Sequence, residues 1–151
     1  MRGISPFLWF NNQAEEAANF YVSIFKNSRI KNLTRYSEGA PMPQGSVMVV
    51  AFELDGREFL ALNGGPMYQF TEAISFVVNC DTQDEIDYYW SKLAEGGKDL
   101  QCGWLKDKYG LSWQIVPTSI GRIMSDPVRG PRAMAALMKM VKIDIKALEE
   151  A

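Results

Sequence analysis

The sequence predicts an α+β fold of two tandem βαβββ modules followed by a helical tail. The order of strand and helix patterns in the first half is repeated in the second half, and several residue spacings recur with it. After Ser125 the composition changes to methionine, alanine and leucine at helical spacing. At 151 residues the chain can bury a core of its own. We therefore expect one domain over residues 1–120, with module one at 1–70 and module two at 71–120, and a C-terminal helical extension at 121–151.

Module one opens with a short strand and an amphipathic helix. The aromatic-rich run Ile4–Phe10 predicts the strand. Asn12, with Glu15 three residues later, is typical of a capping box and predicts that the helix begins here. Apolar residues then recur at helical spacing from Ala14 to Phe25, and the loop formers at 26–28 end the helix.

The rest of module one reads as three strands, at Arg29–Tyr36, Ser46–Leu54 and Arg57–Asn63. Asp55-Gly56 joins the last two, because this dipeptide tolerates the positive φ of a tight hairpin. Two prolines and two glycines in Glu38–Gly45 predict a loop.

Module two repeats this order. Thr82 followed by Glu85 is again typical of a capping box, and an apolar stripe predicts a helix up to Ala94. Gly96-Gly97 supplies the helix stop. The other expected elements are strands at Ile74–Asn79, around Trp104 and Leu105, and at Leu111–Val116, with a turn at Asp107–Gly110.

Two spacings indicate an internal duplication. E-x3-F-Y beginning at Glu16 recurs as E-x3-Y-W beginning at Glu85, and G-x3-L-x-L beginning at Gly56 recurs as G-x3-Q-x-V beginning at Gly110. From Ser125 onward we expect one or two helices. Methionines in this tail suit a packing or dimer surface better than a ligand gate, because methionine fills irregular apolar gaps.

The composition excludes several function classes. The chain has no histidine, so Ser-His-Asp and Cys-His catalysis and imidazole metal ligation are ruled out. A net charge of −2 gives no electrostatic footprint for nucleic acid or for an anionic membrane surface. Cys80 and Cys102 have no C-x-x-C spacing, which favours reduced thiols and a cytoplasmic location.

Several motifs carry a resemblance to a known family: A-E-E-A-x2-F-Y from Ala14, I-S-F from Ile74, C-G-W-L-x-D-K-x-G-x2-W-Q-I-V-P from Cys102, and K-I-D-I-x2-L from Lys142. The chain resembles the vicinal oxygen chelate superfamily of glyoxalase, bleomycin-resistance and extradiol-dioxygenase folds. More narrowly it resembles the PhnB-like subgroup, which is often labelled 3-demethylubiquinone-9 3-methyltransferase. The resemblance implies that each module curls its sheet around a cleft with its helix outside, and that the protein is a homodimer.

The resemblance also implies where a metal would bind. Metal-using members take ligands from the first and last strands of each module. The last-strand positions fall on Leu60 and Gln114, and the first-strand positions fall near Pro6 and 73–75. An apolar side chain offers no lone pair and a neutral amide is a weak ligand alone, so we expect no metal and no other cofactor at this site.

Strand alternation, with Gln114 taken as facing the cleft, predicts the cleft lining. Ser112 and Val116 share its face. Such a lining is mostly apolar with a few polar groups, which suits a small organic ligand held in the cleft between the modules. The expected ligand-binding residues are Leu8, Phe10, Glu58, Leu60, Leu62, Asn63, Ser75, Val77 and Gln114.

The sequence leaves three functions open, and with them the question whether the protein is an enzyme. The first is a metal-independent small-molecule binding protein. The second is an enzyme that uses a carboxylate such as Glu58, a thiol such as Cys102, or a metal held at other positions. The third is the methyltransferase of the label, which the absence of a G-x-G-x-x-G turn disfavours. A plainer alternative for Gln114 is that it only satisfies a neighbouring strand or a buried water, and for Trp104 and Trp113 that they pack in the core or at an interface.

Overall fold

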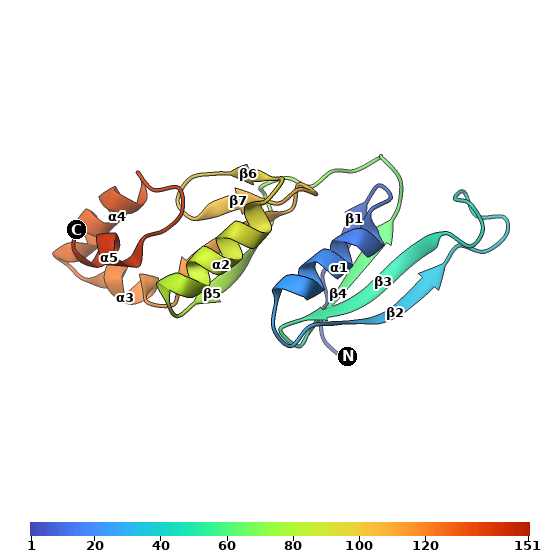
Figure 1. Ribbon diagram of the computed structural model, residues 1–151, viewed down its shortest axis with the longest axis horizontal. Helices are drawn as coiled ribbons and strands as arrows, with labels where there is room; N and C mark the ends of the chain where they lie inside the picture. The colour runs from blue at the N-terminus through green and yellow to red at the C-terminus, as the bar shows by residue number, and fades with distance from the viewer. The chain divides into compact units, whose positions relative to one another are not determined.

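The computed structural model describes residues 1–151 and confirms the α+β fold of two βαβββ modules with C-terminal helices. The chain forms two compact units, Met1–Gln69 and Phe70–Ala151. Each unit contains one four-stranded sheet, and one helix lies along one face of that sheet (Figure 1). No helix is long and apolar enough to cross a membrane.

The first unit has the strand order β1-β4-β3-β2, in which β1 is parallel to β4 and the other pairs are antiparallel. The turn between β3 and β4 is the expected tight hairpin, with positive φ at Asp55 (52°) and Gly56 (73°). The elements are β1 (Phe7–Phe10), α1 (Ala14–Ile24), β2 (Arg29–Arg35), β3 (Val47–Leu54) and β4 (Arg57–Asn63).

The core of the first unit lies between α1 and the sheet. The buried stripe of α1 consists of three alanines, Tyr21 and Ile24, and the ring of Tyr21 stacks on that of Phe52 with the centroids 6.4 Å apart. Phe52 in turn stacks on Phe59 of the neighbouring strand at 5.6 Å. Small residues on the helix let it approach closely, and the aromatic rings fill the layer between helix and sheet.

The start of α1 differs from the sequence prediction. The N-cap is Gln13, not Asn12, and its side chain makes no capping hydrogen bond. Instead the backbone N–H of Ala14 donates to Oδ1 of Asn63 at 2.8 Å, while Nδ2 of Asn63 donates to the carbonyl of Val47 at 3.1 Å. The predicted capping box at Asn12 is therefore wrong, because a residue from β4 caps the helix.

The second unit repeats the topology, with the strand order β5-β8-β7-β6 and β5 parallel to β8. Two features were not predicted: the two-residue strand β6 and the helix α3, which ends at Ser125, while α4 and α5 confirm the helices expected after Ser125. The elements are β5 (Ser75–Cys80), α2 (Gln83–Ala94), β6 (Lys98–Asp99), β7 (Trp104–Lys106), β8 (Ser112–Pro117), α3 (Ile120–Ser125), α4 (Arg129–Leu137) and α5 (Ile145–Glu149).

The start of α2 confirms the sequence prediction. Thr82 is the N-cap, and its Oγ1 accepts from the backbone N–H of Glu85 at 3.2 Å. The carboxylate of Glu85 reaches back to the N–H of Asp81 at 3.0 Å. The backbone N–H groups of Glu85 and Asp81 are thus both bonded by residues within one turn, so local sequence is enough to specify where α2 begins.

A buried carboxylate holds the turn between β7 and β8. Asp107 is 3% exposed, and it accepts backbone N–H bonds from Tyr109 at 2.8 Å and Leu111 at 3.1 Å. It also accepts the indole N–H of Trp113 at 2.9 Å. Trp113 is a core residue, as the plainer alternative proposed, and Asp107 ties it to the turn.

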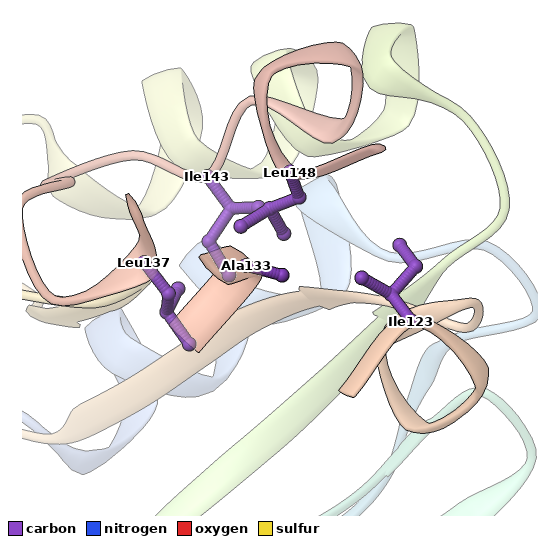
Figure 2. Close-up of a cluster of buried hydrophobic side chains, with 5 residues drawn as sticks. All are labelled: Ile123, Ala133, Leu137, Ile143 and Leu148. Atoms are coloured by element: carbon purple, nitrogen blue, oxygen red, sulfur yellow. The ribbon is translucent and has the colours of Figure 1, made fainter. Parts of the chain in front are cut away.

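The tail helices enclose a small core of their own. Backbone N–H groups of Cys102 and Gly103 donate to the carbonyls of Met140 and Val141, both at 2.8 Å, which ties the tail to the loop before β7. Gln83 at the start of α2 accepts from the N–H of Ile145 at 2.9 Å. The buried cluster, shown in Figure 2, consists of Ile123, Ala133, Leu137, Ile143 and Leu148.

Candidate functional site: the open faces of the two sheets

Each sheet has one face against its helix and one face turned away, which we call the open face. Strand register assigns side chains to these faces, because paired residues on neighbouring strands point to the same side. Sheet one presents Phe7, Trp9, Val49, Ala51, Glu53, Glu58, Leu60 and Leu62 on its open face. Sheet two presents Ser75, Val77, Asn79, Trp104, Lys106, Ser112, Gln114 and Val116.

In sheet one the predicted facing is right for the last strand and wrong for the first. Leu60 and Leu62 lie on the open face together with Glu58. Leu8 and Phe10 lie on the helix face, where they are 7% and 4% exposed. The cause is register: Leu8 pairs with buried Ala61, so Leu8 and Phe10 point to the helix side and Phe7 and Trp9 to the open side.

Asn63 also lies apart from the predicted cleft lining. It follows Leu62 on β4 and therefore points to the opposite side. Both groups of its side-chain amide are occupied, since Oδ1 caps α1 and Nδ2 bonds to Val47. Its role in this structure is to join the helix to the sheet.

An aromatic pair closes one end of the open face of sheet one. The indole N–H of Trp9 donates to the carbonyl of Gly65 at 2.9 Å, and its ring meets that of Tyr68 edge-on with the centroids 4.9 Å apart. A Cβ at Gly64 would lie 2.5 Å from the Trp9 ring, so only glycine lets the chain pass there. Sequence analysis missed Trp9, because it assigned the wrong face to β1.

In sheet two the register agrees with the facing predicted from alternation. Val77 pairs with Gln114 and Ser75 pairs with Ser112, so all four side chains share the open face. The amide Nε2 of Gln114 donates to Oγ of Ser75 at 3.0 Å. At the far end of the face Val116 packs against the cluster of tail residues shown in Figure 2. The structure thus brings Ser75, Val77 and Gln114 together; ligand binding by them stays a prediction.

Ser112 stands out among the polar groups of this face. It is fully buried, and its Oγ makes no hydrogen bond. Its partner on β7 is Lys106, whose ammonium pairs with the carboxylate of Glu72. The half-buried Trp104 on the same strand is the partner of Gln114. Leaving a buried hydroxyl without a partner costs about 1–3 kcal/mol, so this atom lies where a hydrogen-bonding partner would be stabilising.

Glu58 does not have the surroundings of a general base. Its carboxylate accepts from the hydroxyl of Ser5 at 2.9 Å and pairs with the ammonium of Lys31 at 3.1 Å. The hydrogen bond from Ser5, followed by the bond and charge of Lys31, lowers the pKa of Glu58 below its ordinary value. A catalytic base at neutral pH needs a raised pKa, so these contacts act in the opposite direction.

The two cysteines have different surroundings. Cys80 is fully buried, and burial together with the charges of Glu85 and Asp81 raises the pKa of its thiol to about 11. Cys102 has a positive φ of 59° and its sulfur lies 3.9 Å from the sulfur of Met138. Lys106, the basic residue near Cys102 in sequence, is paired with Glu72. The raised pKa of Cys80 disfavours the thiolate form that a nucleophile needs.

The side chains of the two units include no group of ligands suited to a metal ion. No three side chains among Cys, Asp and Glu gather in a group that could hold one. At the two last-strand positions Leu60 offers no lone pair, and Gln114 offers one neutral amide oxygen. The residues present do not fit the divalent ion that metal-using members of the resembled superfamily hold.

The tail contains a pocket of about 290 Å³ with an apolar floor and a charged rim, lined by Arg122, Ile123, Asp126, Arg129, Leu148 and Glu149. Its acidic groups already have partners. Asp126 accepts the backbone N–H groups of Val128 and Arg129 at 2.9 and 2.8 Å, and Glu149 pairs with Arg122 at 3.6 Å. The rim is close to neutral, and we assign no function to it.

Comparisons with known proteins agree with this architecture. Residues 2–116 match the family described as 3-demethylubiquinone-9 3-methyltransferase. The PhnB protein from Bacillus cereus is 40% identical, with a TM-score of 0.71, over 78% of this chain and 100% of that chain. Protein PA1353 from Pseudomonas aeruginosa is 20% identical, with a TM-score of 0.64, over 78% of this chain and 98% of that one.

A more distant structure shares the fold alone. The fosfomycin resistance protein FosX from Mesorhizobium loti is 11% identical, with a TM-score of 0.53, over 76% of this chain and 90% of that one. No curated protein matches the sequence. The chain belongs to the family described as 3-demethylubiquinone-9 3-methyltransferase, and it has the glyoxalase-like fold of the vicinal oxygen chelate superfamily.

Proposed function

We propose that this protein binds a small, mostly apolar organic molecule on the open faces of its sheets, without a metal ion. The observation that carries the proposal is the make-up of these faces. Sheet one presents the apolar Leu60, Leu62 and Trp9 beside the ion-paired Glu53 and Glu58, and sheet two adds the neutral polar Gln114 and Ser75. Binding sites for small organic molecules combine an apolar lining with a small number of polar groups in this way.

An enzymatic alternative finds less support. Glu58 is exposed and ion-paired with its pKa lowered, and the pKa of the Cys80 thiol is raised, so neither group has the surroundings of a base or nucleophile tuned to neutral pH. The methyltransferase of the family description is disfavoured by the sheets. Each has four strands with a single parallel pair, whereas the common methyltransferase fold has a doubly wound parallel sheet with a glycine-rich turn.

A cytoplasmic homodimer is part of the proposal. Both cysteines are free, which suits a reducing compartment. Phe7 on β1 and Val77 on β5, both edge strands, are 54% and 48% exposed. Exposed apolar side chains on strand edges are a surface that a second copy would cover. Light scattering of the purified chain tests this part: a mass of one chain across the micromolar range would contradict it.

Two measurements test the binding proposal: mass spectrometry of a copurifying molecule and binding of an apolar dye. Mass spectrometry of protein purified under native conditions is expected to show an organic molecule that is released on unfolding. An apolar fluorescent dye is expected to bind the emptied protein, and Leu60→Asn is expected to weaken that binding. Val128, which is 65% exposed at the start of α4 and outside both sheets, gives the control Val128→Asn, which should leave dye binding unchanged.

Metals supply the opposing test. A metal ion that binds the folded protein and not the unfolded chain must raise the melting temperature of the protein. We expect Zn²⁺, Ni²⁺ and Mn²⁺ at one equivalent to leave the melting temperature unchanged. A rise of several degrees that Gln114→Ala abolishes would overturn the metal-independent proposal and favour the enzymatic alternative.

A further inference from the structure

We propose that the outward side of α4 docks on the surface of an anionic phospholipid bilayer. This inference goes beyond the proposed function, because it concerns the tail and not the two sheets. The docking surface, which we call the α4 face, consists of the apolar residues Pro131, Met134 and Met138 and the cationic residues Arg129, Arg132 and Lys139.

The inner side of α4 is held in place, and this fixes the direction of the outer side. Leu137 belongs to the buried tail cluster shown in Figure 2. A Cβ at Gly130 would lie 2.3 Å from the carbonyl oxygen of Met124 in α3, so only glycine lets the two helices approach this closely. The N–H groups of Met138 and Lys139 donate to carbonyls of the preceding turn at 3.0 and 3.1 Å. The helical path therefore continues past Leu137 and includes both residues.

Apolar side chains recur at i, i+3 and i+7 along the outer side of α4. Pro131 is exposed, and Met134 and Met138 are 46% and 62% exposed. Met140, by contrast, packs against the tail cluster. Unbranched methionine side chains adapt to irregular apolar surroundings, which suits contact with lipid chains. The face thus offers apolar atoms that the fold itself leaves in water.

Cations flank these apolar side chains. Arg129, Arg132 and Lys139 are exposed, and none of the three makes a salt bridge. Asp126, the acid that precedes α4, accepts backbone N–H bonds at the start of the helix. The side chains of residues 121–151 carry a net charge of +2 and those of residues 1–120 a net charge of −4. The whole-chain charge of −2 therefore conceals a basic tail.

An anionic bilayer matches this face better than a protein partner does. A two-fold interface with a second copy, centred on α4, would bring the three cations against the same three of that copy, and like charges repel. An acidic peptide would need a groove to enclose the apolar side chains, and the pocket in the tail has a nearly neutral rim. A bilayer takes an apolar ridge into its interface while arginine and lysine reach the lipid phosphates.

Sedimentation of the full chain with vesicles tests the proposal. We expect the protein to bind phosphatidylcholine vesicles that contain about 30% phosphatidylserine, and to stay in solution with vesicles of phosphatidylcholine alone. Lys139→Gln should weaken binding to the anionic vesicles by about fivefold, which is the contribution of one cation near an anionic surface. Lys26→Gln makes the same change at an exposed lysine of the first unit and should leave binding unchanged.

The apolar part of the face has its own pair of variants. Met138→Ser should weaken binding to the anionic vesicles by about threefold, because less apolar surface enters the bilayer. Met67→Ser, at a methionine of the first unit that is 73% exposed, should leave binding unchanged. The melting temperature of each variant shows that the chain is folded.

Four results would overturn the proposal. The first is no binding to the anionic vesicles, or equal binding to both kinds of vesicle. The second is an equal loss of binding in Lys139→Gln and Lys26→Gln. The third is binding to soluble polyglutamate as tight as binding to the anionic vesicles, which would point to an acidic protein. The fourth is a change of mass in light scattering caused by Met138→Ser, which would point to a second copy of the chain.

Discussion

The two open faces have the same backbone and different chemistry. Leu60 of module one and Gln114 of module two occupy equivalent places, four residues after the turn glycine, and each has its partner on the first strand of its own sheet. In sheet one that partner is Phe7, and in sheet two it is Val77 beside Ser75. Duplicated topology thus fixes where a ligand contact can be, while single residues decide whether it is apolar or hydrogen-bonding.

The two helices make the same comparison from the other side. Tyr21 of α1 and Trp90 of α2 are equivalent in the duplicated spacing, and they are 1% and 8% exposed. We expect Trp90→Ala and Tyr21→Ala each to lower the free energy of unfolding by about 3 kcal/mol or more, as truncations of large core side chains. Urea unfolding followed by circular dichroism measures both. If only one variant were destabilised, the modules would not share a common way of packing their helices.

The N-termini of α1 and α2 are capped differently, and removing each cap should lower the free energy of unfolding by a different amount. Asn63→Ala removes two long-range hydrogen bonds, to Ala14 and Val47, and should cost about 2 kcal/mol. Thr82→Ala removes one local bond at α2 and should cost about 1 kcal/mol. The same unfolding measurement compares the two variants. A larger loss for Thr82→Ala would mean that the long-range cap contributes less than its geometry indicates.

At the end of the first strand the two sheets differ in a titratable group. Cys80 occupies the place in sheet two that Phe10 occupies in sheet one. The folded thiol has its pKa raised to about 11 from an ordinary 9.0, so its protonated form stabilises the folded state below pH 9.0. That stability is lost as the pH rises from 9.0 to about 11. Cys80→Ala should reduce the fall in unfolding free energy over this window; an unchanged fall would show that other groups cause it.

The smallest effect on stability is expected at Gln114. Its amide makes one hydrogen bond on a half-buried face, so Gln114→Ala should change the free energy of unfolding by less than about 1 kcal/mol. Retention of the copurifying molecule should nevertheless fall. Destabilisation equal to that of Trp90→Ala would mean that Gln114 has a structural role, as the plainer alternative holds.

Much of the fold could be predicted because its signals are local. The capping box at Thr82, the hairpin at Asp55-Gly56 and the stripes of both helices each lie within a few residues. Strand β6 was missed because two exposed charged residues carry no pattern. The predicted faces were right where polar and apolar residues alternate, as around Gln114.

Prediction failed where both faces of an element are apolar. In β1 every residue is leucine or aromatic, so alternation gives no direction, and only pairing with β4 shows that Leu8 and Phe10 point to the helix. The cap of α1 failed for a related reason, since Asn63 is 49 residues away from Ala14 along the chain. No local pattern reports a partner at that separation.

The sequence by itself determined the order of elements, the duplication and the loss of histidine chemistry, because each is written in spacing or composition. Only the tertiary structure decided which side chains share an open face, how Asn63 is used, and that Ser112 is buried without a partner. These depend on register and burial. Both arise from contacts between residues far apart in the chain, whose energies outweigh local preference.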